Sequence, residues 1–407
     1  MQEHTITIER LVNGGNGMGR LPDGKAIFIP FVLPGEVVRV AVREEKKRHA
    51  FGNLIEVVEA NPIRIKPQCV HFKQCGGCHY QHIPYEDQVQ TKRSIFREQL
   101  TRLGGIEQLP PIDCIAAKNQ WHYRNTVQFH TTKKGALAFM DAANAQPFPV
   151  KECWLPMDAI STLWPQISLD EQIDIKRMEM RQNDAGDLLM VVESHGNAIP
   201  EMEIALPISV VHIDPADEVV LSGDPFLVQT MGVHQFRVSA KSFFQTNFEG
   251  ATALVNTVKE ITSSLGGILL DLYCGVGFFS RFLAEQFDEI VAIEQSQSAC
   301  DDYLYNMREY GHFSLYQGAV EHVLPDLDIK ADCVVVDPPR KGIDRHALDA
   351  IAVMRAPVVV YVSCDPSTLA RDIKRFSRTG YQLKRSTIID MFPQTHHIES
   401  VNLLKLK

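Results

Sequence analysis

The sequence predicts an α/β protein built from three consecutive parts, residues 1–59, 60–235 and 236–407. Short apolar runs at regular spacing indicate a small β-barrel in the first part. One long helical pattern, followed by strand-like runs and turns, indicates a mixed α+β domain in the second. In the third part strands and helices alternate, which is typical of a parallel sheet covered by helices. A chain of 407 residues is expected to hold two or three domains.

The composition is that of an ordinary globular protein, with 45% hydrophobic and 22% charged residues. The net charge of −9 argues against a generic nucleic-acid binder, so an RNA partner would be held by local basic patches. No apolar run is long enough to span a membrane. The first residues lack the basic and apolar regions of a secretory leader. We therefore expect a cytoplasmic protein, acting as a monomer.

The first part alternates strand-like runs with turn signals at Pro22–Gly24 and Leu33–Gly35. The predicted strands are Thr5–Ile8, Ala26–Phe31, Glu36–Val42 and Phe51–Val58. The glycine-rich run Asn13–Gly19 is expected to be a loop. The mixed-charge run Arg43–His49 is either a solvated hairpin or a loop that faces RNA.

Three cysteines lie within ten residues, at Cys69, Cys75 and Cys78, with two glycines between the last two. In a cytosolic chain such spacing is more typical of a metal centre than of disulfides. A fourth ligand is needed, for which Cys153 is the best candidate and Cys114 the second. Four cysteines suit either zinc or a [4Fe–4S] cluster. A tight triplet with one distant cysteine favours the iron–sulfur site.

Tyr85–Leu103 has the periodicity of an amphipathic helix, ended by two glycines, and we expect it to pack on the C-terminal domain. The runs Asn125–Phe129, Leu188–Val192 and Ile208–Ile213 are predicted strands of a largely antiparallel sheet. Trp121–Asn125 combines aromatic rings with a cation. It is either an RNA-stacking surface or the ordinary start of a strand.

The third part begins with a predicted helix, Ala251–Leu265, and then a strand, Ile268–Leu272. That strand runs into Tyr273-Cys-Gly-Val-Gly277, then a helix, then the strand Ile290–Ile293, which ends in Glu294. Glycines let the backbone approach a nucleotide, and an acid after the second strand can hold ribose hydroxyls. Because only G-x-G is present, the pattern favours S-adenosylmethionine over a dinucleotide.

Two further predicted strands are followed by residues that could take part in catalysis. Cys333–Val336 ends in Asp337-Pro-Pro-Arg340, a rigid polar edge beside the expected cofactor. The apolar run Val358–Val362 ends in Ser363-Cys364-Asp-Pro366. Open α/β sheets bind ligands at the carboxyl ends of their strands. Cys364 is therefore either a nucleophile or a buried structural cysteine.

Taken together, these motifs resemble the RNA 5-methyluridine methyltransferases, the family of 23S rRNA and T-loop tRNA uracil-C5 enzymes. The matching stretches are the glycine loop 271–277, the D-P-P-R and S-C-D-P motifs, Ser242–Asn247 (SFFQTN), and Thr395–Glu399 (THHIE). The first 59 residues resemble a TRAM domain, an OB-like RNA-binding barrel. The resemblance spans the whole chain.

The resemblance implies a Rossmann-like class I methyltransferase domain and assigns roles to residues. It implies Cys364 as nucleophile, Glu399 as base, and a cofactor site at Gln245, Tyr273, Glu294 and Asp337. It also implies a [4Fe–4S] cluster on Cys69, Cys75, Cys78 and Cys153. One departure is Phe278, where some members carry a polar residue.

The chemistry of uracil is consistent with this assignment. Uracil C5 attacks a sulfonium methyl group only after a thiolate adds at C6. A base must then remove the C5 proton so that the thiolate can leave. Glu399 is the preferred base and His397 the alternative. The target base must also leave its stack.

Two other function classes compete: a Rossmann redox enzyme with an electron-transfer cluster, and a non-catalytic RNA-binding protein that senses iron. The missing third glycine argues against the first, and the second leaves Cys364 and Glu399 without a role. Among RNA substrates we favour 23S rRNA, with tRNA as the alternative.

Overall fold

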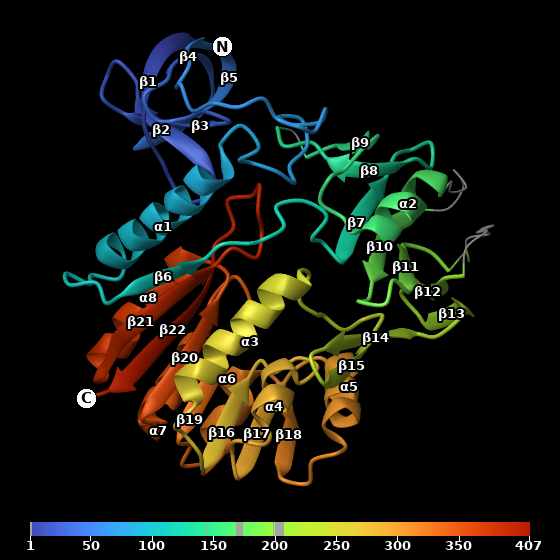
Figure 1. Ribbon diagram of the computed structural model, residues 1–407. Coiled ribbons are helices and arrows are strands. Elements are labelled where there is room, and N and C mark those ends of the chain that lie inside the picture. Colours follow the sequence, from blue (N-terminus) through green and yellow to red (C-terminus); the bar gives the residue numbers. More distant parts are fainter. Residues whose placement is uncertain (1, 144, 168–173, 198, 200–206) are drawn as a thin grey trace.

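The computed structural model describes residues 2–143, 145–167, 174–197, 199 and 207–407. Figure 1 shows the N-terminal barrel at one end of the molecule and a large twisted sheet at the other. A smaller sheet stands to the side, and its residues lie between those of the barrel and those of the large sheet in sequence. The red segment that follows β21 (Tyr381–Ile389) rises from the large sheet toward the place where the three parts meet.

Five strands close into the N-terminal barrel in the order β1-β2-β3-β5-β4. Their bounds are β1 Glu3–Leu11, β2 Asn16–Arg20, β3 Ala26–Pro30, β4 Val37–Glu45 and β5 His49–Glu59. The expectation of a glycine loop over residues 13–19 is wrong in its second half, because β2 begins at Asn16. Gly17 and Gly19 serve packing, since a Cβ at either would collide with an isoleucine methyl of β1. Glycine at these positions lets β2 pack closely against the isoleucine side chains of β1.

The central sheet has seven strands in the order β13-β12-β11-β10-β7-β8-β9. Their bounds are β7 Thr126–Thr131, β8 Leu137–Met140, β9 Pro147–Pro149, β10 Ile175–Gln182, β11 Leu188–Ser194, β12 Ser209–Ile213 and β13 Glu218–Ser222. All pairings except the parallel pair β11–β12 are antiparallel. Helix α2 (Asp158–Leu163) and a 3₁₀ turn (Trp164–Gln166) contribute Ile160, Leu163 and Trp164 to the core of this sheet.

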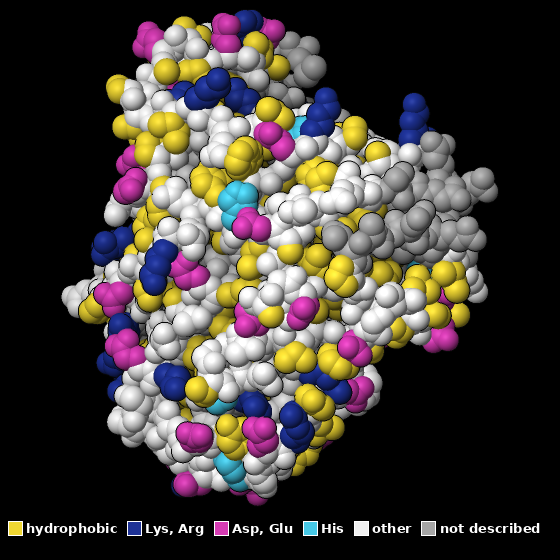
Figure 2. Space-filling model, turned by 45° about the vertical axis from the view of Figure 1, so that its right-hand side comes forward, with side chains coloured by type: hydrophobic (Ala, Val, Ile, Leu, Met, Phe, Trp, Pro, Cys, Tyr) yellow, Lys and Arg dark blue, Asp and Glu magenta, His cyan; other side chains and the backbone are white. Residues whose placement is uncertain are grey.

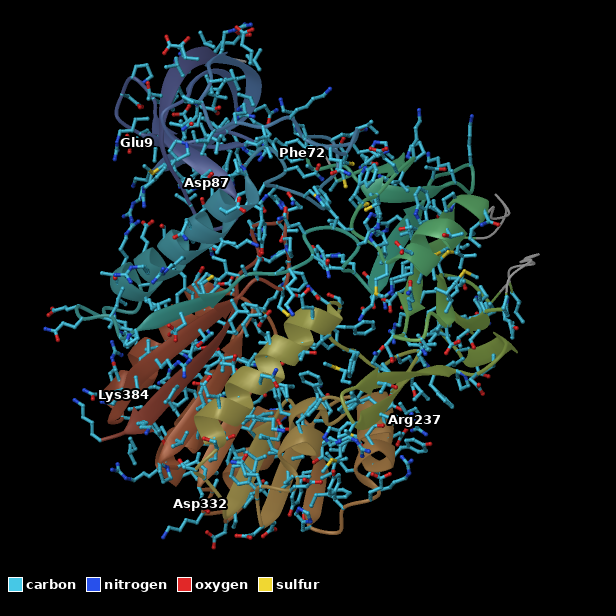
Figure 3. The ribbon with its side chains drawn as sticks, in the orientation of Figure 1. Glu9, Phe72, Asp87, Arg237, Asp332 and Lys384 are labelled. Atoms are coloured by element: carbon cyan, nitrogen blue, oxygen red, sulfur yellow. The ribbon has the colours of Figure 1, made fainter. Side chains whose placement is uncertain are left out.

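The hairpin β14 (Phe226–Met231) and β15 (His234–Ser239) connects the central sheet to the C-terminal domain. Arg237, labelled in Figure 3, anchors it on helix α5 (Gln297–Met307). Its Nε donates to Asp302 Oδ1 at 2.7 Å, and its guanidinium lies 4.5 Å from the ring centroid of Tyr305. A charge pair at this connection fixes how the hairpin meets the C-terminal domain.

The C-terminal sheet has eight strands in the order β18-β17-β16-β19-β20-β22-β21-β6. Its other bounds are β6 Ile112–Ile115, β16 Ile268–Leu272, β17 Glu289–Glu294, β18 Phe313–Gln317, β19 Cys333–Val336, β20 Val358–Ser363 and β22 Glu399–Leu406. Its helices are α3 Phe248–Thr262, α4 Phe278–Leu283, α6 Val320–Val323, α7 Arg345–Met354 and α8 Pro366–Arg378, with a 3₁₀ turn at Leu324–Asp326. Apolar residues on both faces of the sheet form two cores, as expected for a sheet covered on both sides.

The strands of this sheet are not all parallel. β22 lies between β20 and β21 and is antiparallel to both. No helix separates β21 from β22, and without a crossover element consecutive neighbouring strands run antiparallel. β6, from residues 60–235, then pairs in parallel with β21 at the outer edge. Neither feature was expected from the alternation of strands and helices.

Helix α1 (Tyr85–Arg102) begins after Pro84 and ends before two glycines. Its buried Ile95, Phe96 and Leu100 share a core with Leu369 and Phe376 of α8. The helix therefore packs on the C-terminal domain although the chain carries it in the central region. The domain limits at residues 59 and 235 stay a prediction.

Within the described residues, no helix is long and apolar enough to cross a membrane. On the face shown in Figure 2, acidic and basic side chains are interspersed.

Candidate active site

Cys364 and Glu399 are brought together by strand register. β20 and β22 pair antiparallel with Ser363 opposite Ser400, so the next pair at the same edge is Cys364 and Glu399. Asp365 accepts hydrogen bonds from the N–H groups of Ser367 and Thr368 and so starts α8. The thiol thus lies at the junction of a buried strand and a capped helix, a rigid position.

Burial and neighbouring acids raise the pKa of both groups. Burial, with Glu399 and Asp337 nearby, raises the pKa of the Cys364 thiol to about 12. Burial, with Asp337 nearby, raises the pKa of Glu399 well above its usual range. Arg340 opposes both shifts. These four side chains form one electrostatically coupled group at the edge of the sheet.

Asp337 follows β19, the neighbour of β20. Burial raises its pKa to about 7, and the nearby Asp271 adds to the shift. Asp271 is itself buried on β16, and its Oδ2 accepts from Ser280 Oγ at 2.6 Å. Burial raises the pKa of Asp271 to about 7 as well. A cationic ligand at this edge would favour the ionised forms of these acids.

The glycine loop between β16 and α4 is held by Glu294 at the end of β17. Glu294 Oε2 accepts from the Gly275 N–H at 3.0 Å, and Oε1 accepts from the next two backbone N–H groups at 2.8 and 2.7 Å. Gly277 has φ +87°, and a Cβ there would lie 3.0 Å from the Tyr303 ring. Both a left-handed backbone and close packing therefore require glycine at this position.

The other predicted cofactor residues flank this loop. Tyr273 follows β16 with a left-handed backbone at φ +60°. Gln245 is half-buried, and its carbonyl accepts from Asn125 Nδ2 at 2.9 Å. Gln245 thus joins the central domain to the cofactor side of the sheet. Phe278 packs with Phe236 and other aromatic rings, so this departure from the family pattern has a structural partner.

Cys69, Cys75, Cys78 and Cys153 line one cavity of about 390 Å³, between the segment after the barrel and the strands β7 and β8. Phe72, labelled in Figure 3, lies in this segment and contacts Phe31 of the barrel with ring centroids 5.1 Å apart. Burial and nearby thiols raise the pKa of Cys78 and of Cys153 to about 12. The four thiols therefore share one site, assembled from loops rather than strands.

Cys114, the second candidate for the fourth ligand, is not in the cavity lining. It lies on β6 opposite Ile388, near Asp390 and Lys92. Across the described ranges, no three His, Cys, Asp or Glu side chains are arranged to hold a metal ion. The four thiols surround a cavity without converging on one point.

The sequence assigned no role to Arg340, and it gave Trp121–Asn125 two interpretations. The position of Arg340 after a strand-end acid was the available signal. Tyr123 is buried, with its hydroxyl donating to the Pro393 carbonyl at 2.9 Å. Arg124 lines the cysteine cavity and lies 5.7 Å from the ring centroid of Phe392. These two side chains are internal, so the start of a strand is the better interpretation for them.

Comparison with known proteins identifies the family. The sequence profile of the tRNA (Uracil-5-)-methyltransferase family matches residues 206–312 and 323–407. The TRAM domain profile matches residues 1–55. An RNA methyltransferase of Aquifex aeolicus is 34% identical over 99% of this chain and 98% of its own. The chain belongs to the tRNA (uracil-5-)-methyltransferase family.

Further relatives extend the family match over the whole chain. An RNA methyltransferase of Halalkalibacterium halodurans is 32% identical over 99% of this chain and 96% of its own. The Pyrococcus abyssi tRNA (uracil-54, C5)-methyltransferase, solved with S-adenosyl-L-homocysteine, has a TM-score of 0.74 at 24% identity. That match covers 98% of this chain and 99% of the other, and it confirms the predicted fold. The predicted resemblance to the family and its TRAM barrel is likewise confirmed.

Proposed function

We propose that this member of the tRNA (uracil-5-)-methyltransferase family transfers a methyl group from S-adenosylmethionine to C5 of a uridine in RNA. The observation that carries the proposal is that Cys364, directly after β20, lies close to Glu399 at the sheet edge that also holds Asp337. A nucleophile and a base at one edge meet the requirement of C5 methylation. The Rossmann-like redox alternative is not favoured by the family match.

In the proposed reaction the Cys364 thiolate adds to C6 of the flipped uracil, and C5 becomes carbanion-like. S-adenosylmethionine, when bound, supplies the methyl group. Glu294, Gln245, Tyr273 and Asp337 would hold it. Glu399 then takes the proton from C5, the C5–C6 double bond re-forms, and the thiolate leaves. Cys364 is thus regenerated, and the C5 proton ends on Glu399.

Because the pKa of Cys364 is raised to about 12, the thiol must lose a proton before it can add to C6. The raised pKa of Glu399 disfavours the ionised form that accepts the C5 proton. Arg340 favours ionisation of both and is the cation of the group. A sulfonium at the same edge would act in the same direction. We propose that the site is activated by substrate binding rather than kept ionised at rest.

We also propose a [4Fe–4S] cluster on Cys69, Cys75, Cys78 and Cys153. The fit is supported by four thiols around one cavity, because this cluster is larger than a single ion. It is also supported by two buried donors lining the cavity, Arg124 Nε and Trp154 Nε1, which have no hydrogen-bond partner among the described residues. Such donors suit an anionic, sulfur-rich occupant.

The experiment that tests the chemistry uses RNA containing 5-fluorouridine, because fluorine cannot leave as a proton does. Wild-type protein should form a stable protein–RNA adduct, seen as a slow band on a denaturing gel, and Cys364→Ala should form none. Cross-linking by Cys364→Ala would assign the nucleophile to another cysteine and reject the proposal.

For the substrate we propose 23S rRNA, because the combination of a TRAM barrel and a cysteine cluster suits the rRNA branch of the resemblance. A tRNA substrate is the second candidate, favoured by the name of the matching profile and by the P. abyssi relative. Mass mapping of 5-methyluridine in a deletion strain separates them. Loss of the nucleoside from 23S rRNA supports the first candidate, and loss from tRNA supports the second. The proposed monomer would act in the cytoplasm, where both RNAs are found.

A further inference from the structure

The segment Met391–Gln394, which precedes Glu399, is fixed from outside by an unusual set of hydrogen bonds. Its four consecutive backbone carbonyls each accept a hydrogen bond from a different part of the chain. The donors are, in order, Asn247 Nδ2, Lys92 Nζ, the Tyr123 hydroxyl, and the backbone N–H groups of His79 and Tyr80, at 2.9, 2.9, 2.9, 2.8 and 3.0 Å. They come from the SFFQTN motif, α1, the start of β7 and the residues directly after Cys78. Residues of the central region and of the C-terminal domain therefore meet on this segment.

Gln394 is the most constrained residue of the segment. Its backbone is left-handed, with φ +67°, which is unfavourable for a residue other than glycine. Its side-chain Oε1 accepts from Gln88 Nε2 at 2.9 Å, and its N–H donates to Gln88 Oε1 at 3.0 Å. Gln88, on α1, is 1% exposed and also donates to the carbonyls of Tyr80 and Ile83. Gln88 thus binds Gln394 and, at the same time, the end of the segment 69–83 that carries the three clustered cysteines, here called the cysteine segment.

Lys92 supports the same arrangement one helical turn further along α1. It is 1% exposed, and its Nζ donates to Asp390 Oδ1 at 2.7 Å. Tyr85 donates to the other oxygen of Asp390 at 2.8 Å. Three side chains of one helix face thus hold the chain between β21 and β22. These buried polar side chains of α1 fix the geometry of the loop, because each of them would be costly if left without a hydrogen-bond partner.

The path from Gln394 to Glu399 is short and internally bonded. Thr395 Oγ1 donates to the Phe392 carbonyl at 2.8 Å, and the His397 N–H donates to Thr395 Oγ1 at 3.3 Å. Glu399 then opens β22. A displacement of Gln394 would therefore reach the Glu399 carboxyl, whereas Cys364 is held independently by β20 and α8.

We propose that Gln88 and Gln394 are positioning residues for Glu399, and that through them the cysteine segment controls the last step of the reaction. The inference rests on the proposed role of Glu399 as the base. It predicts a selective defect. Nucleophilic addition by Cys364 and methyl transfer should continue, while proton removal and release of the RNA should slow.

The test is Gln88→Met, which keeps the volume of the side chain and removes its hydrogen bonds. We expect turnover to fall at least tenfold and the methylated protein–RNA adduct to accumulate on denaturing gels. The rate of trapping by 5-fluorouridine RNA and the KM for S-adenosylmethionine should remain near the wild-type values. Gln394→Gly provides a second variant, because glycine tolerates the left-handed backbone and removes the side-chain hydrogen bond with Gln88 while keeping the one from the backbone N–H.

Two reference variants make the result decisive. Phe96 lies on the same helix, is buried, and belongs to the core shared with α8 rather than to the core that contains Met391, so Phe96→Leu controls for a loss of stability alone. Glu399→Gln shows the full defect in proton removal. If Glu399→Gln accumulates adduct but neither glutamine variant does, the positioning role is wrong. If Glu399→Gln turns over normally, the base is another group, such as His397, and the proposed role of Glu399 fails first.

Discussion

The molecule contains two thiol sites with the same electrostatic signature and different architecture. Burial raises the pKa of Cys364 and of Cys78 to about 12 in each case. Cys364 ends a strand, and sheet register places its partner Glu399 opposite it. Cys78 and its three companions lie on loops around a cavity of about 390 Å³. The first site thus brings a thiol and an acid together by strand register, whereas the second encloses a cavity in which we propose a cluster.

This difference indicates what each site does. A strand-end thiol with an acid beside it can change its bonding during a reaction without loss of the fold. Thiols on loops around a cavity would instead stabilise the local fold when they bind a metal centre, because metal ligation and local structure are coupled. The comparison therefore predicts that substitutions at Cys364 abolish catalysis with little change in stability, and that substitutions in the cavity affect stability.

The largest expected effect is that of Cys364→Ala. Loss of a nucleophile costs several orders of magnitude in rate, so methyl transfer should fall below detection while the melting temperature stays close to that of wild type. Cys333→Ala is the matched control, because Cys333 is a buried thiol on the neighbouring strand β19. Methyl transfer is measured with labelled S-adenosylmethionine. Comparable losses in both variants would mean that Cys364 is structural.

Next in size is the effect of Cys78→Ser or Cys153→Ser. Anaerobically purified wild-type protein should be brown, with broad absorbance near about 400 nm from a cysteine-ligated cluster. Each variant should lose most of its iron and melt several degrees lower, since a destabilisation of a few kcal/mol has this effect in a domain of this size. The Cys114→Ser variant should keep its iron, and its melting temperature should change little. A colourless wild-type protein with stoichiometric zinc would reject the iron–sulfur assignment.

The contrast between strands and loops also explains what could be predicted from sequence. Ile268–Leu272 and Cys333–Val336 were predicted with the bounds that the structure shows, because buried parallel strands are short apolar runs with clear ends. The positions of Cys364 and Glu294 could be predicted because each lies at the carboxyl end of such a strand. The antiparallel insertion of β22 was missed, because sheet order depends on connections rather than on local pattern.

Loop residues were harder to place for a physical reason. Neither Cys153 nor Cys114 has a spacing from the triplet that identifies it as the fourth ligand, and only the tertiary fold sends Cys114 to the edge of the large sheet. The hydrogen bonds of Gln88 to Gln394 join residues 306 positions apart, so no local pattern reveals them. Gly17 and Gly19 were interpreted as loop glycines because glycine marks both turns and close packing.

A smaller effect is expected from Glu294→Ala. The carboxylate holds the Gly275 N–H, and in the proposed complex it also binds the ribose hydroxyls. Its removal should weaken S-adenosylmethionine binding by about 1.5 kcal/mol, roughly tenfold in Kd. Glu289→Ala, at the opposite and exposed end of β17, is the control. Equal affinities by calorimetry for both variants would place the ribose contact elsewhere.

The smallest expected effect concerns pH and Arg340. Because the pKa values of Cys364 and Glu399 are raised, their active, ionised forms become more populated as pH increases. Ionisation of Asp337, whose pKa is about 7, opposes this trend, because a second negative charge disfavours both ionised forms. Because the Cys364 pKa of about 12 lies above the neutral range, the thiolate fraction still grows with pH there, and the single-turnover rate should rise. Arg340 favours both ionised forms, so Arg340→Gln should move the profile to higher pH.

Arg340→Lys separates charge from shape in this prediction. Lysine keeps the positive charge, so the profile should stay near the wild-type position even if the maximal rate falls. A shift in Arg340→Gln that Arg340→Lys reverses identifies electrostatic activation of Cys364. An unchanged profile in Arg340→Gln would mean that the bound cofactor supplies the whole effect, so that the thiol site depends on its ligand for activation.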